Sequence, residues 1–304
     1  MKVVVALGGD ALHPSDERRR PERQRAAAER AAQALAPVAR SNDLVVTHGN
    51  GPQAGLLALQ ADDGTEAVPL DVLDAECEGM IGYVLEQELA NALPGREVVT
   101  LSTRVRVDEY DLAFLRPTKP IGPIYDEGTA RSLAEERGFA IGRDGDGWRR
   151  MVASPEPIEI LPLRSIARLI DAGVIVIGAG GGGIPIVTGE DGTTSAVAAV
   201  IDKDIVSALL AIELGADVLV LCTGQPGVYD RFGASDAQLI ERATPAMLRQ
   251  MHFAPGAMGP KVDAVVRFVE ATGGRAAIGA LDDAPALVEG TAGSQVRPAS
   301  VSVI

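Results

Sequence analysis

Short runs of β-branched residues alternate with longer amphipathic stretches along the chain, and this alternation limits the fold more than any other feature of the sequence. The runs expected to form strands are residues 3–7, 44–47, 97–101, 174–177, 217–221 and 275–278. The stretches expected to form helices are residues 21–39, 52–61, 70–93, 163–172, 203–214, 245–251, 261–272 and 282–289. Strands that alternate with helices are typical of βαβ units, so the pattern predicts an α/β fold with a mainly parallel sheet.

One segment, residues 104–157, interrupts this alternation because it is rich in proline, glycine and charged residues. It is too long for an ordinary loop, so we interpret it as a small insertion or flap. We expect a single domain with an N-terminal lobe over residues 1–160, which carries the flap, and a C-terminal lobe over residues 161–304.

The composition excludes several classes of function. The net charge of −14 argues against a nucleic-acid partner, because phosphate backbones require a basic face. The longest apolar runs have the length of strands and are far too short to span a bilayer. Cys77 and Cys222 lie in unrelated apolar contexts, which excludes a disulfide framework and favours buried thiols. With no cleavable signal at the start of the chain, these features lead us to expect a cytoplasmic protein.

Lysine is rare in this chain, which otherwise uses arginine for positive charge. The four lysines are Lys2, Lys119, Lys203 and Lys261. The last three lie in strings rich in glycine, proline or aspartate, where a compact ammonium differs chemically from a planar guanidinium. We therefore treat these three lysines as candidate functional residues.

Four glycine-rich loops follow predicted strands. They are Gly8-Gly9-Asp10, residues 49–52, residues 178–183 and residues 256–261. A tight turn explains any one of them, but several together at the carboxyl ends of parallel strands indicate a ligand site, because glycine lets backbone amides approach an anion. The chain contains no Gly-x-x-x-x-Gly-Lys-Ser/Thr string, and the Gly-x-Gly-x-x-Gly within 178–183 is not followed by a predicted helix, so neither common nucleotide fingerprint applies.

The string Asp202-Lys203-Asp204 is the sharpest chemical signal in the sequence. A lysine held between two carboxylates can direct its charge at a migrating phosphoryl group. The alternative is an ordinary solvated helix start with acidic residues in its first turn. Lys119 is stiffened by flanking prolines on the predicted flap, and Lys261 opposes the dipole of its own helix, which a bound anion would explain.

Other candidates carry weaker signals. His48 could act as an acid or base, or could form a local hydrogen bond, and Tyr229 could flank a nucleotide base or pack in the core. The three histidines and two cysteines show no metal-site spacing.

Taken together, these strings resemble those of carbamate kinases, members of the amino acid kinase family. The resembling segments are residues 5–12, 46–53, 79–83, 117–123, 180–185, 200–204, 258–261 and 268–280. They extend over nearly the whole chain, and the string around Lys119 separates carbamate kinases from other members of the family.

The resemblance implies a three-layer α/β/α sandwich around a mainly parallel eight-stranded sheet, with a small protruding subdomain. It also implies a homodimer that catalyses ATP + carbamate = ADP + carbamoyl phosphate with Mg²⁺. We expect a small-molecule substrate, carbamate or carbamoyl phosphate, and neither nucleic acid nor a membrane as a partner. By the same resemblance, the enzyme would run mainly toward ATP synthesis in nitrogen or arginine catabolism.

The resemblance also implies roles for particular residues. Related kinases carry a lysine where this chain has Ala6, and Lys119 on the flap would supply the missing charge. Lys203 and Lys261 would stabilise the migrating phosphoryl group, and Asp204 would orient them. The carbamate and phosphate side would comprise Gly8, Gly9, Asp10, Asn50 and Gly51. The nucleotide side would comprise Thr223, Tyr229, Ala257, Met258 and Gly259.

Two positions depart from the family pattern. The first loop has Asp10 where the family usually has asparagine, and a carboxylate cannot donate a hydrogen bond to a phosphoryl oxygen. Pro226 stands near a position where the family often has aspartate or asparagine. Two alternatives therefore accompany the carbamate kinase hypothesis: a paralogous kinase for another small carboxylate-like acceptor, and a catalytically silent nucleotide-binding regulator.

Overall fold

The computed structural model describes residues 1–9, 21–50, 53, 57, 68–234, 236–253 and 258–299. The predicted helix at 52–61 lies outside these ranges, apart from residues 53 and 57. Within them, no helix combines the length and the apolar character that a bilayer crossing requires.

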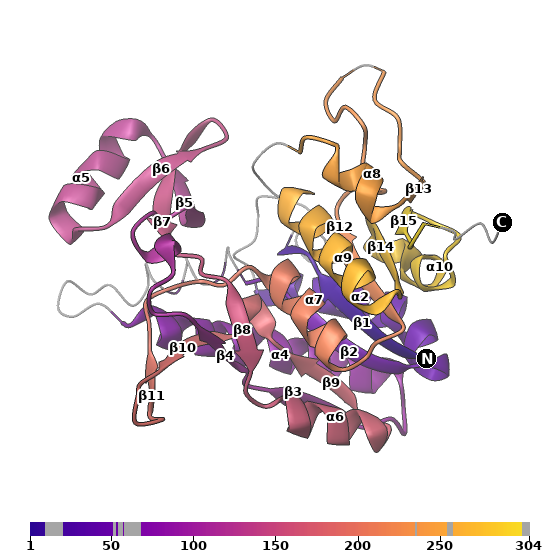
Figure 1. Cartoon of the computed structure of the whole chain (residues 1–304). Helices are drawn as coiled ribbons and strands as arrows, with labels where there is room; N and C mark the ends of the chain where they lie inside the picture. Colours follow the sequence, from indigo (N-terminus) through magenta and orange to yellow (C-terminus); the bar gives the residue numbers. More distant parts are fainter. Residues whose placement is uncertain are drawn as a thin grey trace.

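An eight-stranded sheet forms the centre of the molecule (Figure 1). In spatial order its strands are β13 (Arg242–Ala243), β15 (Ser294–Val296), β14 (Arg275–Ala280), β12 (Val218–Thr223), β1 (Lys2–Leu7), β2 (Asp43–His48), β9 (Ile175–Gly178) and β3 (Val98–Leu101). Every neighbouring pair is parallel except β14 and β15. This confirms the predicted mainly parallel eight-stranded sheet.

Helices cover both faces of this sheet. Strand β1 shows why, because its successive side chains point to opposite faces: Val3, Val5 and Leu7 join one buried cluster, and Val4 and Ala6 join the other. The first cluster includes side chains from α2 (Pro21–Ser41), α4 (Leu70–Ala92) and α10 (Ala284–Glu289). The second includes side chains from α6 (Leu163–Asp171), α7 (Lys203–Glu213) and α9 (Met258–Thr272). The three-layer α/β/α sandwich is therefore confirmed.

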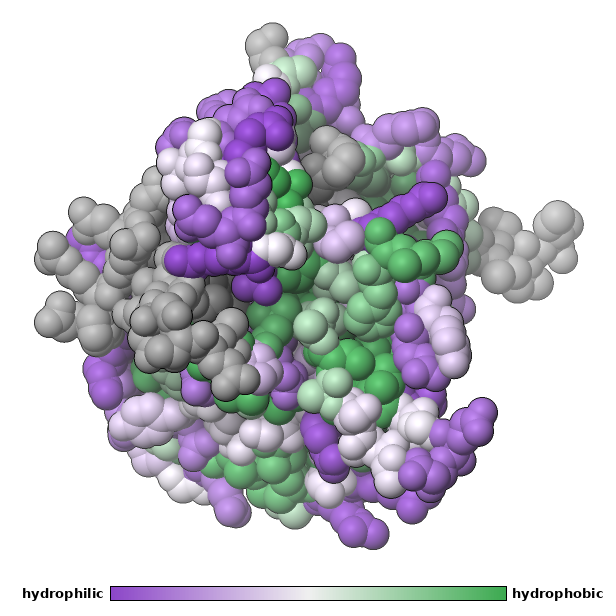
Figure 2. Space-filling view, turned by 90° about the vertical axis from the view of Figure 1, so that its left-hand side faces the viewer, coloured by the Kyte–Doolittle hydropathy of each residue, from purple (hydrophilic) through white to green (hydrophobic). Residues whose placement is uncertain are grey.

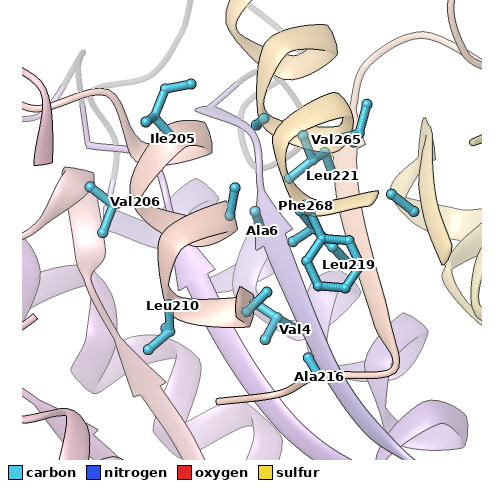
Figure 3. Close-up of a cluster of buried hydrophobic side chains, with 14 of the residues drawn as sticks. Val4, Ala6, Ile205, Val206, Leu210, Ala216, Leu219, Leu221, Val265 and Phe268 are labelled. Atoms are coloured by element: carbon cyan, nitrogen blue, oxygen red, sulfur yellow. The ribbon is translucent and has the colours of Figure 1, made fainter. Parts of the chain in front are cut away.

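The second cluster packs the helices α7 and α9 directly on the central strands (Figure 3). Phe268 of α9 is fully buried and packs in the same cluster as Val4 of β1 and Leu219 of β12. Val206 and Leu210 of α7 belong to that cluster as well. Because both helices are anchored by buried apolar side chains, their first turns are held at fixed positions beside the strand ends.

A second, four-stranded sheet lies beside the main one. Its order is β11 (Thr194–Ala196), β10 (Ile184–Thr188), β4 (Arg104–Val107) and β8 (Pro157–Ile160). Strands β4 and β8 pair with each other at the two ends of the segment predicted as a flap. None of these four short strands was predicted from the sequence. The division into two lobes stays a prediction.

Between β4 and β8 the chain forms a protruding subdomain (Figure 1). After a short 3₁₀ turn η1 (Leu112–Phe114), it comprises β5 (Lys119–Tyr125), α5 (Glu127–Arg137), β6 (Ala140–Asp144) and β7 (Gly147–Val152). The three strands form an antiparallel sheet in the order β5-β7-β6. We call residues 119–152 the flap from here on.

The flap joins the body through a small apolar cluster. Ile121 and Val152 of the flap pack with Leu70, Leu73 and Val200 of the body. Figure 2 views the molecule from the side on which the flap lies in Figure 1, and hydrophobic side chains gather in the middle of this face with hydrophilic ones along much of its edge. Among the residues that the structure describes, no flap side chain belongs to the two buried clusters that cover the main sheet, so the flap has its own small apolar contact with the body.

The remaining elements are short: α8 (Pro245–Arg249) and the 3₁₀ turns η2 (Gly180–Gly182) and η3 (Leu281–Asp283). All six predicted strands occur with bounds within two residues of those expected, and the predicted helices inside the described ranges agree within three. Both cysteines, Cys77 and Cys222, are buried thiols, as expected.

Candidate active site

The first turn of α7 is the centre of the candidate site. Asp202 caps this helix, because its Oδ1 accepts a hydrogen bond of 2.9 Å from the backbone N–H of Asp204. The cap starts the helix at Lys203 and places Lys203 and Asp204 in its first turn. The expected alternative, a solvated helix start, does not describe these residues, because the side chain of Lys203 is 11% exposed and that of Asp204 is 6% exposed.

Two lysines share the carboxylate of Asp204. Lys203 Nζ lies 2.5 Å from Asp204 Oδ1, and Lys261 Nζ, from the first turns of α9, lies 3.1 Å from Asp204 Oδ2. Burial alone would raise the pKa of Asp204, but the two ammonium groups outweigh burial and lower this pKa to about 2. Asp204 is therefore ionised at neutral pH and fixes the direction of both lysines.

The third lysine reaches the same place from the flap. Lys119, the first residue of β5, has its Nζ 2.5 Å from Asp202 Oδ2. Three ammonium groups, from the flap, α7 and α9, thus bond to two carboxylates that are two residues apart in the sequence. The structure brings Lys119, Lys203 and Lys261 together, while their roles in a reaction stay predictions.

The first two glycine-rich loops meet beside Lys203. The amide of Gly8 donates to the carbonyl of Cys222, and the amide of Gly49 donates to the carbonyl of Leu7, so each loop continues directly from its strand. A Cβ added to Gly49 would lie 3.1 Å from Gly9 N and 3.6 Å from Lys203 Cε. The loops at Gly9 and Gly49 therefore approach each other next to the lysine. Asp10 and Gly51 lie outside the described residues.

Asn50 is buried beneath this region. Its Nδ2 donates a 3.3 Å hydrogen bond to Asp74 Oδ1 of α4. Its amide also packs on the backbone of Gly181, where an added Cβ would lie 2.1 Å from Asn50 Nδ2. Position 181 in the glycine-rich loop at 178–183 therefore has no room for a side chain, because Asn50 occupies that space. The sequence did not reveal this role of Asn50.

Two buried acids of α4, Asp74 and Glu78, support these loops. Glu78 accepts hydrogen bonds of 3.0 Å from the amides of Thr103 and Gly180. Burial raises the pKa of Glu78 to about 7, although the two amides oppose this shift. Burial also raises the pKa of Asp74 to about 8 against the opposing hydrogen bond from Asn50.

Sequence reasoning missed both acids. Their signal was present, because positions 74 and 78 are four residues apart in a predicted helix and share its apolar face.

His48 makes a local contact. Its ring is fully buried, and Nδ1 lies 3.4 Å from the carbonyl oxygen of Gly49. Burial, helped by the charge of Lys203, lowers the pKa of His48 to about 4, although the hydrogen bond with Gly49 opposes this shift. The imidazole is therefore neutral at pH 7. Its contact with Gly49 corresponds to the expected local hydrogen bond, while a role as an acid or base stays a prediction.

On the nucleotide side the predicted residues are more scattered. Thr223 is the buried last residue of β12, and Met258 and Gly259 open α9 two or three positions before Lys261. Tyr229 is half-buried and meets Phe232 edge to face with ring centroids 6.1 Å apart. Ala257 lies outside the described residues. The structure thus links Met258 and Gly259 to the lysine cluster through α9, while Tyr229 pairs with an aromatic neighbour.

Comparison with known proteins gives one consistent result. The model of the amino acid kinase family matches residues 1–279. The carbamate kinase of Rhizobium meliloti is 50% identical over 299 residues, which cover 97% of this chain and 92% of that protein. The carbamate kinase of Haemophilus influenzae is 44% identical over 299 residues, which cover 97% of this chain and 96% of that protein.

Solved structures agree with these relatives. The carbamate kinase of Giardia lamblia bound to AMP-PNP matches with a TM-score of 0.88 at 35% identity, and the match covers 98% of each chain. The same protein bound to citric acid matches with a TM-score of 0.91 at 35% identity, again over 98% of each chain.

Proposed function

Since the chain belongs to the carbamate kinases of the amino acid kinase family, we propose that Lys119, Lys203 and Lys261 carry its phosphoryl transfer between ATP and carbamate. The reaction is ATP + carbamate = ADP + carbamoyl phosphate. One observation carries the assignment of residues: the three ammonium groups bond to the carboxylates of Asp202 and Asp204 at the first turn of α7.

Phosphoryl transfer requires the protein mainly to position the two substrates and to supply positive charge. A migrating phosphoryl group spreads negative charge over its oxygens, so oriented cations stabilise it and no covalent intermediate with the protein is needed. Lys203 lies beside the glycine loop at Gly49 and would contact the transferred group, while Lys261 would contact it from the nucleotide side. Asp204 holds both, and Lys119 would close over the group from the flap.

The acceptor would lie over the two glycine loops. The glycine loop at Gly8 and Gly9, the side chain of Asn50 and the loop at Gly51 would position carbamate for in-line attack. The buried acid Asp74 accepts a hydrogen bond from Asn50 Nδ2 and so limits how the Asn50 amide can turn. Positioning of this kind converts a reaction between two molecules into one within a single complex.

ATP and ADP would bind on the C-terminal side, at Thr223, Tyr229 and the loop formed by Ala257, Met258 and Gly259. The complex of the Giardia relative with AMP-PNP supports a nucleoside triphosphate as substrate. The first turn of α9 adds support, because a helix start favours negative charge and this one carries Lys261.

Mg²⁺ would accompany the nucleotide. Among the described residues no group of three histidine, cysteine or carboxylate side chains could hold a metal ion. Asp202 and Asp204 are each bonded to lysine, so they do not form a metal cage. Mg²⁺ commonly binds substrate phosphates and keeps several waters, and it would neutralise phosphate charge here.

The biological setting rests on the family resemblance. We expect the enzyme to run toward ATP synthesis in nitrogen or arginine catabolism, in the cytoplasm and as a homodimer. Carbamoyl phosphate is a mixed anhydride, which makes phosphoryl transfer to ADP the chemically easy direction.

The test is an assay of ATP formation. Purified protein is supplied with ADP, Mg²⁺ and carbamoyl phosphate, and ATP is measured beside a Lys203→Ala control. We expect ATP from the wild type and a rate lower by at least about 10²-fold in the control, the loss typical of removing one donor to a developing charge. A wild-type rate no higher than that of the control would refute the proposal.

Asp10 motivates one alternative acceptor. If a carboxylate at this position selects another small acid, Asp10→Asn should raise turnover with carbamoyl phosphate and lower it with that acid. An unchanged rate with carbamoyl phosphate, together with no acceptance of other small acyl phosphates by the wild type, would remove this alternative.

A further inference from the structure

We propose that Asp202 is a positioning residue that holds Lys119 of the flap over the first turn of α7. The proposal rests on the function above and adds a residue to it. The two oxygens of this carboxylate have different partners. Oδ1 caps α7 by accepting a 2.9 Å hydrogen bond from the amide of Asp204, and Oδ2 lies 2.5 Å from Lys119 Nζ. One side chain therefore ties the flap to the helix that carries Lys203 and Asp204.

The contact lies where the flap meets the body. The backbone amide of Val200 donates a 2.9 Å hydrogen bond to the carbonyl of Ala153, just after the last flap strand. Ala153 and Ala199 also form an isolated parallel bridge. The segment that leads into Asp202 is thus paired with the segment that leaves the flap, and both ends of the Lys119–Asp202 contact are held by backbone.

The ion pair differs from an ordinary surface pair. The side chain of Lys119 is 29% exposed and that of Asp202 is 20% exposed, and the residues are 83 positions apart in the sequence. Partial burial reduces screening by water and salt. The Asp202 cap also keeps the carboxylate in one place, so Lys119 meets a fixed partner and not a mobile one.

A carboxylate beside a phosphoryl site repels the substrate, so its presence needs a compensating role. An ammonium group has three N–H donors. One donor of Lys119 bonds to Asp202, which leaves two for an anionic substrate. Asp202 thus orders a long, flexible side chain before the substrate binds and leaves its remaining donors available.

The test uses Asp202→Asn, which keeps an oxygen to cap α7 and removes the charge that pairs with Lys119. We expect kcat for ATP formation to fall by about 10- to 100-fold with a change in KM for ADP below about threefold, because small misplacements of a catalytic group can cost about 10²-fold in rate. In a Lys119→Ala background the same substitution should change kcat by less than about twofold, because Asp202 would have nothing left to position.

A second measurement is independent of activity. Hydrogen exchange of the ligand-free protein should show faster exchange across residues 119–125 in Asp202→Asn, with residues 275–280 in the main sheet unchanged as an internal reference. The matched variant Asp202→Ala loses the cap as well, so it should lower Tm more than Asp202→Asn does.

The outcomes separate the two proposals. An equal fall in kcat with and without Lys119, or a raised Mg²⁺ requirement in both backgrounds, would show that Asp202 acts on the metal or on Lys203 and would overturn the positioning role. Unchanged hydrogen exchange in the flap would overturn it too. A wild-type protein that forms no ATP would refute the proposed function, while the exchange experiment would still decide whether Asp202 holds the flap.

Discussion

Lys261 Nζ lies 3.1 Å from Asp204 Oδ2, and each of these two side chains is only 6% exposed. Because Lys203 occupies the other oxygen of the same carboxylate, Asp204 is a single buried anion between two cations. Two lysines so close together would repel each other without it. Asp204 therefore contributes to stability as well as to the arrangement that the reaction needs.

Asp204→Asn should lower both stability and activity. The substitution leaves two buried ammonium groups beside a neutral amide, and breaking a buried ion pair from one side costs about 3–5 kcal/mol. Urea denaturation measures this loss. The matched control is Asp236→Asn, which breaks an exposed pair with Arg231 and should leave the free energy of unfolding nearly unchanged.

The loss should also depend on pH. The pKa of Asp204 is lowered in the folded protein, so its stabilisation is present above the ordinary carboxyl pKa of about 4 and disappears as the pH falls toward about 2. The stability difference between wild type and Asp204→Asn should therefore shrink in acid. A difference that is the same at every pH would contradict the buried ion pair.

Much of the fold could be predicted from the sequence, because it depends on local periodicity. The central strands are continuous apolar runs such as residues 3–7 and 218–222, and the flanking helices have clear amphipathic spacing. The strands of the second sheet were missed because they are short, and Pro185 and Pro157 within them argue against a strand.

Some parts of the candidate site could be predicted from the sequence and others could not. Lys119, Lys203 and Lys261 could be selected because each lies in an unusual local string, and glycine marked Gly8, Gly9 and the loop at Gly49. The partners that hold the lysines could not all be assigned, since the contact between Lys119 and Asp202 joins residues far apart in the chain. Contacts of that kind depend on tertiary packing, which one sequence read alone does not reveal.

Asp74 predicts an unusual dependence of stability on pH. Its pKa is raised to about 8, so between about pH 4 and 8 the folded protein holds a proton that the unfolded chain releases. Stability should therefore fall as the pH rises through this window. Asp74→Asn removes this titration, so the free energy of unfolding of the variant should fall less steeply with rising pH than that of the wild type. Over the whole window the two should differ by on the order of a few kcal/mol, because one pKa unit corresponds to about 1.4 kcal/mol.

Urea denaturation between pH 5 and about pH 8 tests this expectation. Glu78 and Asp71 also raise the pKa of Asp74 by charge repulsion, and both remain in the variant. The control is Glu76→Gln on the exposed side of the same helix, which should leave the slope unchanged. A slope for Asp74→Asn equal to that of the wild type would show that Asp74 is ionised throughout.

Gly182→Ala should damage the site through the backbone. Gly182 has a φ of 107°, and an added Cβ would lie 2.3 Å from the carbonyl oxygen of Ile201, the residue before Asp202. Strain and overpacking together should cost about 2–5 kcal/mol and lower kcat, since the α7 cap must shift. Thermal unfolding and the ATP-forming assay measure both effects.

The matched control for this substitution is Gly192→Ala. Gly192 also has a positive φ, 81°, but an added Cβ would meet nothing within 4 Å. It should cost about 1–2 kcal/mol from backbone strain alone and leave kcat unchanged. Equal effects of the two variants would show that the contact with Ile201 is unimportant.

The buried hydroxyl pair of Thr47 and Ser207 predicts a coupled loss. Their oxygens lie 2.6 Å apart, and Ser207 Oγ donates a 2.6 Å hydrogen bond to the carbonyl of Lys203, so Thr47 is the donor between them. Ser207→Ala leaves the buried Thr47 hydroxyl without its acceptor and should lower the free energy of unfolding by about 1–3 kcal/mol. Thr47→Val leaves Ser207 bonded to Lys203 and should cost about 0.5–1.5 kcal/mol. The double variant removes both polar groups, so it should lower the free energy of unfolding by less than the sum of the two single changes. If urea denaturation shows that the two losses simply add, the two hydroxyls do not interact.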